Sequence, residues 1–222
     1  MASLLDSLLD QVGGKEMSGQ LAGLLGADAD GTQSAVGAAI PAMLASLANN
    51  SSRPDGAEAL ASALDRHDGS VLDQLGGGFG HVDTGDGEKI VNHMFGTRKG
   101  TVENELASRT GLPLDAIAKL LPMLAPIVLG MLGRQKRSSG LGAGDLASML
   151  NGEKSQAAGM PGLGGLLSKL DLDGDGNPMN DLAGMLGGAG AGAGAAGGGA
   201  AASRSGGGGL LGKVLGGLFK RR

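Results

Sequence analysis

The sequence predicts an all-α protein, and its composition and periodicity carry that prediction. Aromatic residues make up 1% of the chain, with three Phe and no Trp or Tyr. The core must therefore be built from Leu, Ile, Val, Met and Ala, and such a set favours helices over sheets. Apolar residues recur at helical spacing through the first two thirds of the chain, which predicts a compact bundle of about six to eight short helices. The 46 glycines are concentrated toward the end of the chain and predict a low-complexity C-terminal tail.

The N-terminal region predicts three helices. The first covers Ser3 to Val12, with Ser3 as its cap and Asp6 three residues later as in a capping box. The second covers residues 15–25 and ends at Gly26. After a turn at residues 28–31, the third covers residues 32–49, where an internal proline predicts a kink or a split.

Four further helices follow. One begins at Pro54 and ends near Arg66, and the next two cover residues 88–95 and 101–110. The last, residues 114–134, holds the most apolar stretch of the chain at 120–133, with two internal prolines that should bend it. That stretch is shorter than the ~20 residues that a membrane-spanning helix needs, so we expect a buried core helix.

The composition divides the chain into four parts. Residues 1–135 form the expected helical domain. Residues 136–186 are Gly-rich with short helices and hold an Asp-rich loop at 171–181. Residues 187–209 are almost entirely Gly and Ala, which predicts a flexible linker, and residues 210–222 form a basic amphipathic tail.

Two acidic stretches resemble each other, and the second has the pattern of a calcium loop. The first is LDRHDGSVLDQL (64–75) and the second is LDLDGDGNPMNDL (170–182). In the second, carboxylates at alternate positions precede a glycine, which lets them face one ion. The expected calcium ligands are Asp171, Asp173, Asp175, Asn177 and Asp181.

This calcium pattern is incomplete, and the first stretch departs from it further. Leu182 occupies the position where a standard loop has a bidentate Glu, so an Asp/Gly turn without an ion is the alternative. In the first stretch, Arg66 stands where the second has Asp173, and its charge would repel a cation. Residues 64–75 are therefore expected to form a structural turn, anchored by Val71, Leu72 and Leu75.

No catalytic residues are predicted. The chain has no cysteine, which excludes disulfides and thiolate chemistry. Its three histidines, at 67, 81 and 93, have no spacing that fixes a zinc site. The glycine runs lack the Lys-Ser/Thr of a phosphate-binding loop, and there is no Gly-x-Ser-x-Gly elbow. We expect no cofactor other than calcium and no small-molecule substrate.

Charge and N-terminal composition bear on partners and location. Residues 1–135 carry a net charge of −7, which disfavours nucleic acid binding. Residues 210–222 place apolar side chains at helical spacing among four basic ones, which is typical of a segment that docks onto a partner protein or an anionic membrane surface. The N-terminus lacks the basic region of a secretory signal, so a cytoplasmic location is expected.

Several stretches together resemble one bacterial family. They are residues 32–75, the run GDGEKIVNHMFG (85–96) and the run LLPMLAPIVLGMLG (120–133), and they are similar to the domain of unknown function numbered 937. The Asp-rich loop, Gly-rich tether and basic end are similar to the tails of many members. The resemblance implies an all-helical soluble domain with no established activity. A more distant similarity to YidB-like proteins implies a homeodomain-like arrangement.

The expected function is that of a non-enzymatic interaction, assembly or adaptor module that contacts a protein partner or a second copy of itself. A DNA-associated homeodomain-like protein is the first alternative, and an enzyme of unknown type is the second.

Overall fold

The structure is a computed structural model that describes residues 3–160 and Gly164, and it confirms the predicted all-α fold. Within this part of the chain there is no β-strand. The elements are α1 (Leu4–Val12), α2 (Lys15–Leu25), α3 (Ala29–Asn50), α4 (Pro54–Arg66), α5 (Ser70–Gln74), η1 (Leu75–Gly77), η2 (Phe79–His81), α6 (Thr84–Phe95), η3 (Gly96–Arg98), α7 (Lys99–Thr110), α8 (Leu114–Ser139) and α9 (Ala143–Ala158).

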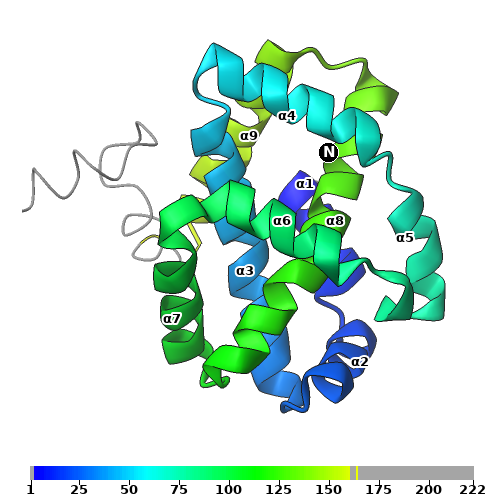
Figure 1. The fold of residues 1–222 in the computed structure, drawn as a ribbon, viewed down its shortest axis with the longest axis vertical. Helices are drawn as coiled ribbons and strands as arrows, with labels where there is room; N and C mark the ends of the chain where they lie inside the picture. The colour runs from blue at the N-terminus through cyan, green and yellow to red at the C-terminus, as the bar shows by residue number, and fades with distance from the viewer. Residues whose placement is uncertain (1–2, 161–163, 165–222) are drawn as a thin grey trace, which may run out of the picture. The chain divides into compact units, whose positions relative to one another are not determined.

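Helices α3 and α8 form the centre of this helical body, and the other helices pack around them (Figure 1). Both are apolar around most of their circumference, as expected of helices that are covered on several sides. Their fully buried side chains include Ile40, Met43, Leu44, Ile117, Leu120, Leu121 and Leu124. The core is almost entirely aliphatic, as the composition predicts.

Local signals set several helix ends where the sequence places them. The Ser3 hydroxyl accepts a hydrogen bond from the Asp6 N–H, and the Asp6 carboxylate accepts one from the Ser3 N–H, which completes the predicted capping box. Gly26 ends α2 in the left-handed region at φ 65°, where glycine carries no steric cost. Pro54 begins α4 at the position where its missing N–H leaves no donor unsatisfied.

Helix α3 begins earlier than predicted and continues through its proline. The stretch expected to be a turn at residues 28–31 is instead the N-terminus of α3, because the Asp28 carboxylate accepts a hydrogen bond from the Gly31 N–H at 2.6 Å. Pro41 lies inside a continuous helix, so of the kink or split expected at this proline, the split is wrong. Pro122 and Pro126 likewise lie inside the unbroken α8. Packing on several sides offsets the lost backbone hydrogen bonds.

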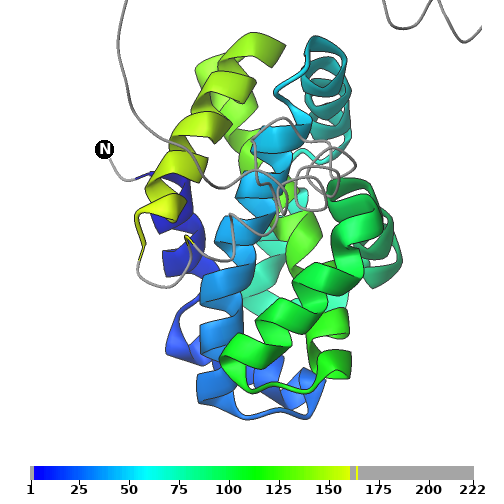
Figure 2. The same ribbon diagram turned by 90° about the vertical axis from the view of Figure 1, so that its left-hand side faces the viewer.

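The helical body also extends past the boundary that the composition suggests. Residue 135 falls inside α8, which ends at Ser139, and α9 follows after a short turn. Figure 2 shows α9 lying along α3, where Leu146, Leu150 and Ala157 are buried in the common core. The Asp-rich loop, the Gly/Ala linker and the basic tail lie outside the described residues.

One helix in the described part of the chain is long and apolar enough to cross a membrane. This is α8, and 83% of its most apolar 18-residue window is buried inside the structure. Its side chains contact the surrounding helices, so within this structure α8 is a core helix, as its sequence predicts.

Candidate docking groove

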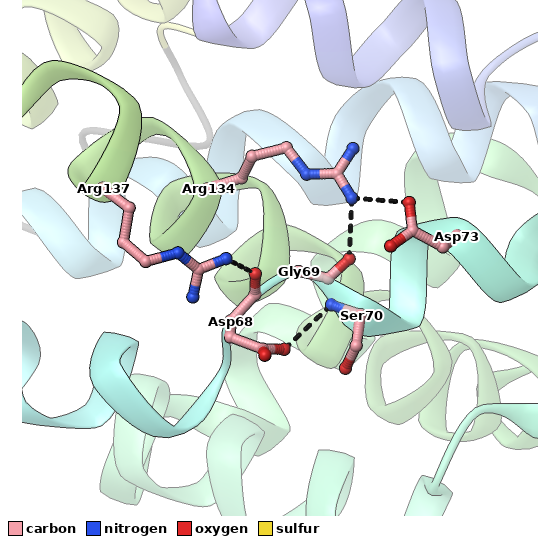
Figure 3. Close-up of polar contacts among 6 residues, drawn as sticks. All are labelled: Asp68, Gly69, Ser70, Asp73, Arg134 and Arg137. Carbon is pink, nitrogen blue, oxygen red and sulfur yellow. Dashed lines mark hydrogen bonds and ion pairs between the residues drawn. The ribbon is translucent and has the colours of Figure 1, made fainter.

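The first acidic stretch forms a turn between α4 and α5 that is held by the C-terminal end of α8. The Arg134 guanidinium donates to the Gly69 carbonyl at 3.0 Å and to the Asp73 carboxylate at 2.8 Å (Figure 3). Arg137 donates to the Asp68 carbonyl, as the same figure shows. Lys136 adds an ion pair with the Asp65 carboxylate. Cations from α8 therefore pair with two of the three carboxylates of this stretch.

The third carboxylate of the turn, that of Asp68, forms a hydrogen bond with the backbone of the turn itself. The Asp68 side chain accepts a hydrogen bond from the Ser70 N–H at 2.9 Å, and this bond lowers the pKa of Asp68 below the ordinary aspartate value. Leu72 and Leu75 are buried, as the sequence predicts for the anchors of a structural turn. Gly133 lies so close to the His67 carbonyl that a side chain there would overlap it.

Beside this turn, α4 and α6 form the walls of an open groove with a volume of about 660 Å³. We call it the α4–α6 groove. Its floor is apolar and comes from four helices, which contribute Leu47, Leu60, Ile90, Met94 and Leu129. Ala59 and Ala63 lie on the α4 wall, where their small side chains leave the floor accessible.

The rim of the α4–α6 groove carries more positive than negative charge. Arg53, Arg66 and Lys89 are exposed, and none of the three has a hydrogen bond or ion pair with the residues that the structure describes. The acidic rim residues are Asp55 and Asp86, and the latter lies 3.8 Å from the His67 Nε2. This local excess of positive charge lies within residues 1–135, whose net charge is −7.

The α4 wall of the groove is fixed at its first turn. Gly56 lies against the Asn50 carbonyl at the end of α3, and any side chain at this position would overlap that oxygen. The close approach seats the N-terminal end of α4 directly on α3.

The α6 wall is fixed at both of its ends. Ser46 Oγ and Asn50 Nδ2 both donate to the Met94 carbonyl, at 2.7 and 3.0 Å, which ties the end of α6 to α3. Near the start of α6, Gly87 lies directly against the Pro122 carbonyl of α8. Both walls of the groove are therefore attached to the central helices α3 and α8.

The histidines lie on or near this groove. His67 and His93 line it, and His81 lies with Asp83 beside a second cavity of about 170 Å³ that shares His67 and Asp86. Across residues 3–160 and 164, no three His, Asp or Glu side chains come together in a way that could hold a metal ion. The predicted calcium ligands, Asp171, Asp173, Asp175, Asn177 and Asp181, lie outside the described residues.

The α4–α6 groove was not predicted from the sequence. Its two walls are about 30 positions apart in the chain, and only the packing onto α3 and α8 brings them together. One feature of the sequence could have indicated it. Gly56, Ala59 and Ala63 lie at helical spacing on one face of α4, where a face packed against another helix would carry larger side chains.

Comparison with known proteins identifies a family. The chain matches no curated protein and no solved structure. The family described as bacterial protein of unknown function, DUF937, matches residues 6–135 and 141–221, which together make up nearly the whole chain. The chain therefore belongs to the DUF937 family of bacterial proteins of unknown function.

Proposed function

We propose that this protein is a non-enzymatic docking module whose α4–α6 groove binds an amphipathic protein segment with acidic side chains. The observation that carries the proposal is the combination of an apolar floor with three rim cations that have no hydrogen bond or ion pair among the described residues. An amphipathic helix binds such a groove through apolar residues at i, i+3 or i+4 and i+7. Acidic residues beside those anchors would pair with Arg53, Arg66 and Lys89.

The volume and position of the groove agree with this use. About 660 Å³ is enough space for several aliphatic side chains, and it lies within the usual range of binding clefts. Elsewhere in the described residues, the large apolar side chains that are exposed are Leu24 and Leu114. We place the module in the cytoplasm, and the tail at 210–222 is proposed as a second docking element.

The cysteine-free sequence allows a direct test with a single fluorescent label. An environment-sensitive dye on Ala63→Cys reports on the groove, and the same dye on Ser62→Cys reports on the exposed outer face of α4. The probes are three synthetic peptides with identical leucine spacing and with acidic, neutral or basic residues between the leucines.

The acidic peptide should bind to the chain labelled at position 63 and leave the dye at position 62 unchanged. Each exposed ion pair contributes about 0.2–1 kcal/mol, so three pairs should make the acidic peptide bind about tenfold more tightly than the neutral one. The basic peptide should bind most weakly. Equal affinity for all three peptides would contradict the proposal.

A further inference from the structure

Residues 165–182 of the chain itself have the chemistry that the α4–α6 groove would select. Leu166, Leu167 and Leu170 supply apolar side chains at helical spacing. Asp171, Asp173 and Asp175 follow them directly. With Asp181 and Lys169, the segment carries four acids and one base, so it is both amphipathic and acidic.

The basic tail is a poorer match to the groove. Residues 210–222 have a comparable apolar pattern, but they carry four basic side chains and no acid. Their charge has the same sign as that of Arg53, Arg66 and Lys89, and like charges repel. Charge therefore distinguishes the two candidate segments and favours residues 165–182.

Helix α9, the last described helix, contacts α3 next to a residue of the groove. On α9, Lys154 Nζ donates to the Asn49 side chain at 2.5 Å, and the next residue, Asn50, lines the groove. Gly164, the last described residue, lies close to the Ala158 carbonyl at the end of α9. An extended chain spans up to about 3.3–3.6 Å per residue, so the seven residues 165–171 can span about 23–25 Å.

We propose that residues 165–182 dock in the α4–α6 groove of the same chain. Leucine side chains would cover the floor, and the carboxylates of Asp171, Asp173 and Asp175 would pair with the rim cations. The segment is then an internal ligand, and an outside partner must displace it before binding. This inference rests on the docking role proposed for the groove.

Disulfide trapping in the full-length chain tests the inference. Ser168→Cys is combined with Ala63→Cys on the groove wall or, as the matched control, with Ser62→Cys on the outer face of α4. Oxidised glutathione supplies the oxidant, and the protein is kept dilute. Mass spectrometry follows the disulfide, and non-reducing electrophoresis separates bonds within one chain from bonds between two chains.

The 63–168 disulfide should form within one chain at least about tenfold faster than the 62–168 disulfide, because docking raises the local concentration of one thiol near the other. Replacing Asp171, Asp173 and Asp175 with Asn should slow it toward the control rate, and high salt should do the same. Equal rates for the two pairs would overturn the inference. Disulfides formed only between chains would also overturn it and would assign the groove to a second copy.

A separate measurement distinguishes failure of this inference from failure of the proposed function. The labelled Ala63→Cys chain is titrated with the acidic synthetic peptide, with and without the three Asp→Asn replacements. If residues 165–182 occupy the groove, the replacements should strengthen peptide binding. Equal peptide binding by the two chains, together with equal disulfide rates, would leave the docking function in place and reject only the internal ligand.

Discussion

At the residue scale, Glu153 shows how a buried charge can be satisfied by helix geometry. It lies on α9 and is 8% exposed, and its two carboxylate oxygens accept hydrogen bonds from the Leu4 and Leu5 N–H groups, each at 2.9 Å. These N–H groups begin α1 and have no partner within that helix. The negative charge also lies at the positive end of the helix dipole. Glu153 therefore joins the last described helix to the first.

Replacing Glu153 with Gln should lower the free energy of unfolding by about 2 kcal/mol. The amide retains one acceptor, loses the charge and leaves one buried N–H without a partner. The matched control is Glu58→Gln on the exposed surface of α4, which should change stability by no more than about 0.5 kcal/mol. Urea unfolding followed by far-ultraviolet circular dichroism measures both, since the chain has no Trp or Tyr. Equal stability of the two variants would show that Glu153 does not cap α1.

Asp68 gives the turn between α4 and α5 a defined pH dependence. The hydrogen bond from the Ser70 N–H lowers its folded-state pKa, so its contribution to stability is fully present above the unfolded-state pKa. That contribution is lost as the pH falls through the lowered folded-state value. In a nuclear magnetic resonance titration, the Asp68 carboxyl should titrate below the ordinary aspartate value of 3.8. A midpoint at or above that value would contradict the hydrogen bond.

At the element scale, the packing of α6 on α8 depends on a proline and a glycine. Pro126 has no N–H, so the Pro122 carbonyl loses the hydrogen bond that it would normally accept from residue 126. Gly87 on α6 lies against this same carbonyl oxygen, where its Cα–H groups can make a weak contact. From the sequence, the prolines were expected only to bend the helix. They expose a backbone oxygen at the contact with α6.

Adding one methyl group at this contact should be strongly destabilising. In Gly87→Ala the new Cβ overlaps the Pro122 carbonyl, and rigid backbone on both sides must move apart, at a cost of about 3 kcal/mol or more. The control is Gly37→Ala inside α3, where nothing lies within 4 Å of the new Cβ. Its better helix propensity should raise stability by about 0.5–1 kcal/mol. The two substitutions are chemically identical, so effects of the same sign in urea unfolding would contradict this account.

The helix ends that the sequence predicts most closely carry local signals. Ser3 with Asp6, Gly26 and Pro54 each act within one turn of the helix that they begin or end. The start of α3 was missed because Asp28 and Gly31 suit both a turn and a helix N-terminus, and only packing distinguishes the two. Helix α9 was underestimated because its region is rich in glycine. Its burial against α3 depends on residues that are about 100 positions away.

At the scale of the whole molecule, contacts between distant residues determine what the two acidic stretches can do. In the first stretch, Asp65 and Asp73 pair with Lys136 and Arg134, which are 61 to 71 positions further along the chain. No local pattern reveals such pairs, and for the same reason the sequence did not predict the α4–α6 groove. In the second stretch, Asp171, Asp173 and Asp175 are candidate ligands of a calcium ion and also candidate partners of the cations on the rim of the groove.

Calcium and the groove should therefore compete for the same carboxylates. An ion held by Asp171, Asp173 and Asp175 would neutralise the charges that the segment presents to the rim. Calcium should slow formation of the 63–168 disulfide toward the rate of the 62–168 control, and it should raise the affinity of the acidic peptide for the groove. Because binding equilibria are reciprocal, the acidic peptide should in turn tighten calcium binding by the same factor.

Calorimetric titration with calcium, on the unmodified chain and on Asp173→Ala, gives the independent measure of ion binding. The substitution should abolish the heat of binding, and calcium should no longer alter the disulfide rate in an Asp173→Ala version of the two-cysteine chain. The absence of heat from the unmodified chain would remove the ion from the account and leave the docking unaffected. Calcium binding without any change in the disulfide rate would show that the carboxylates that hold the ion are not those that face Arg53, Arg66 and Lys89.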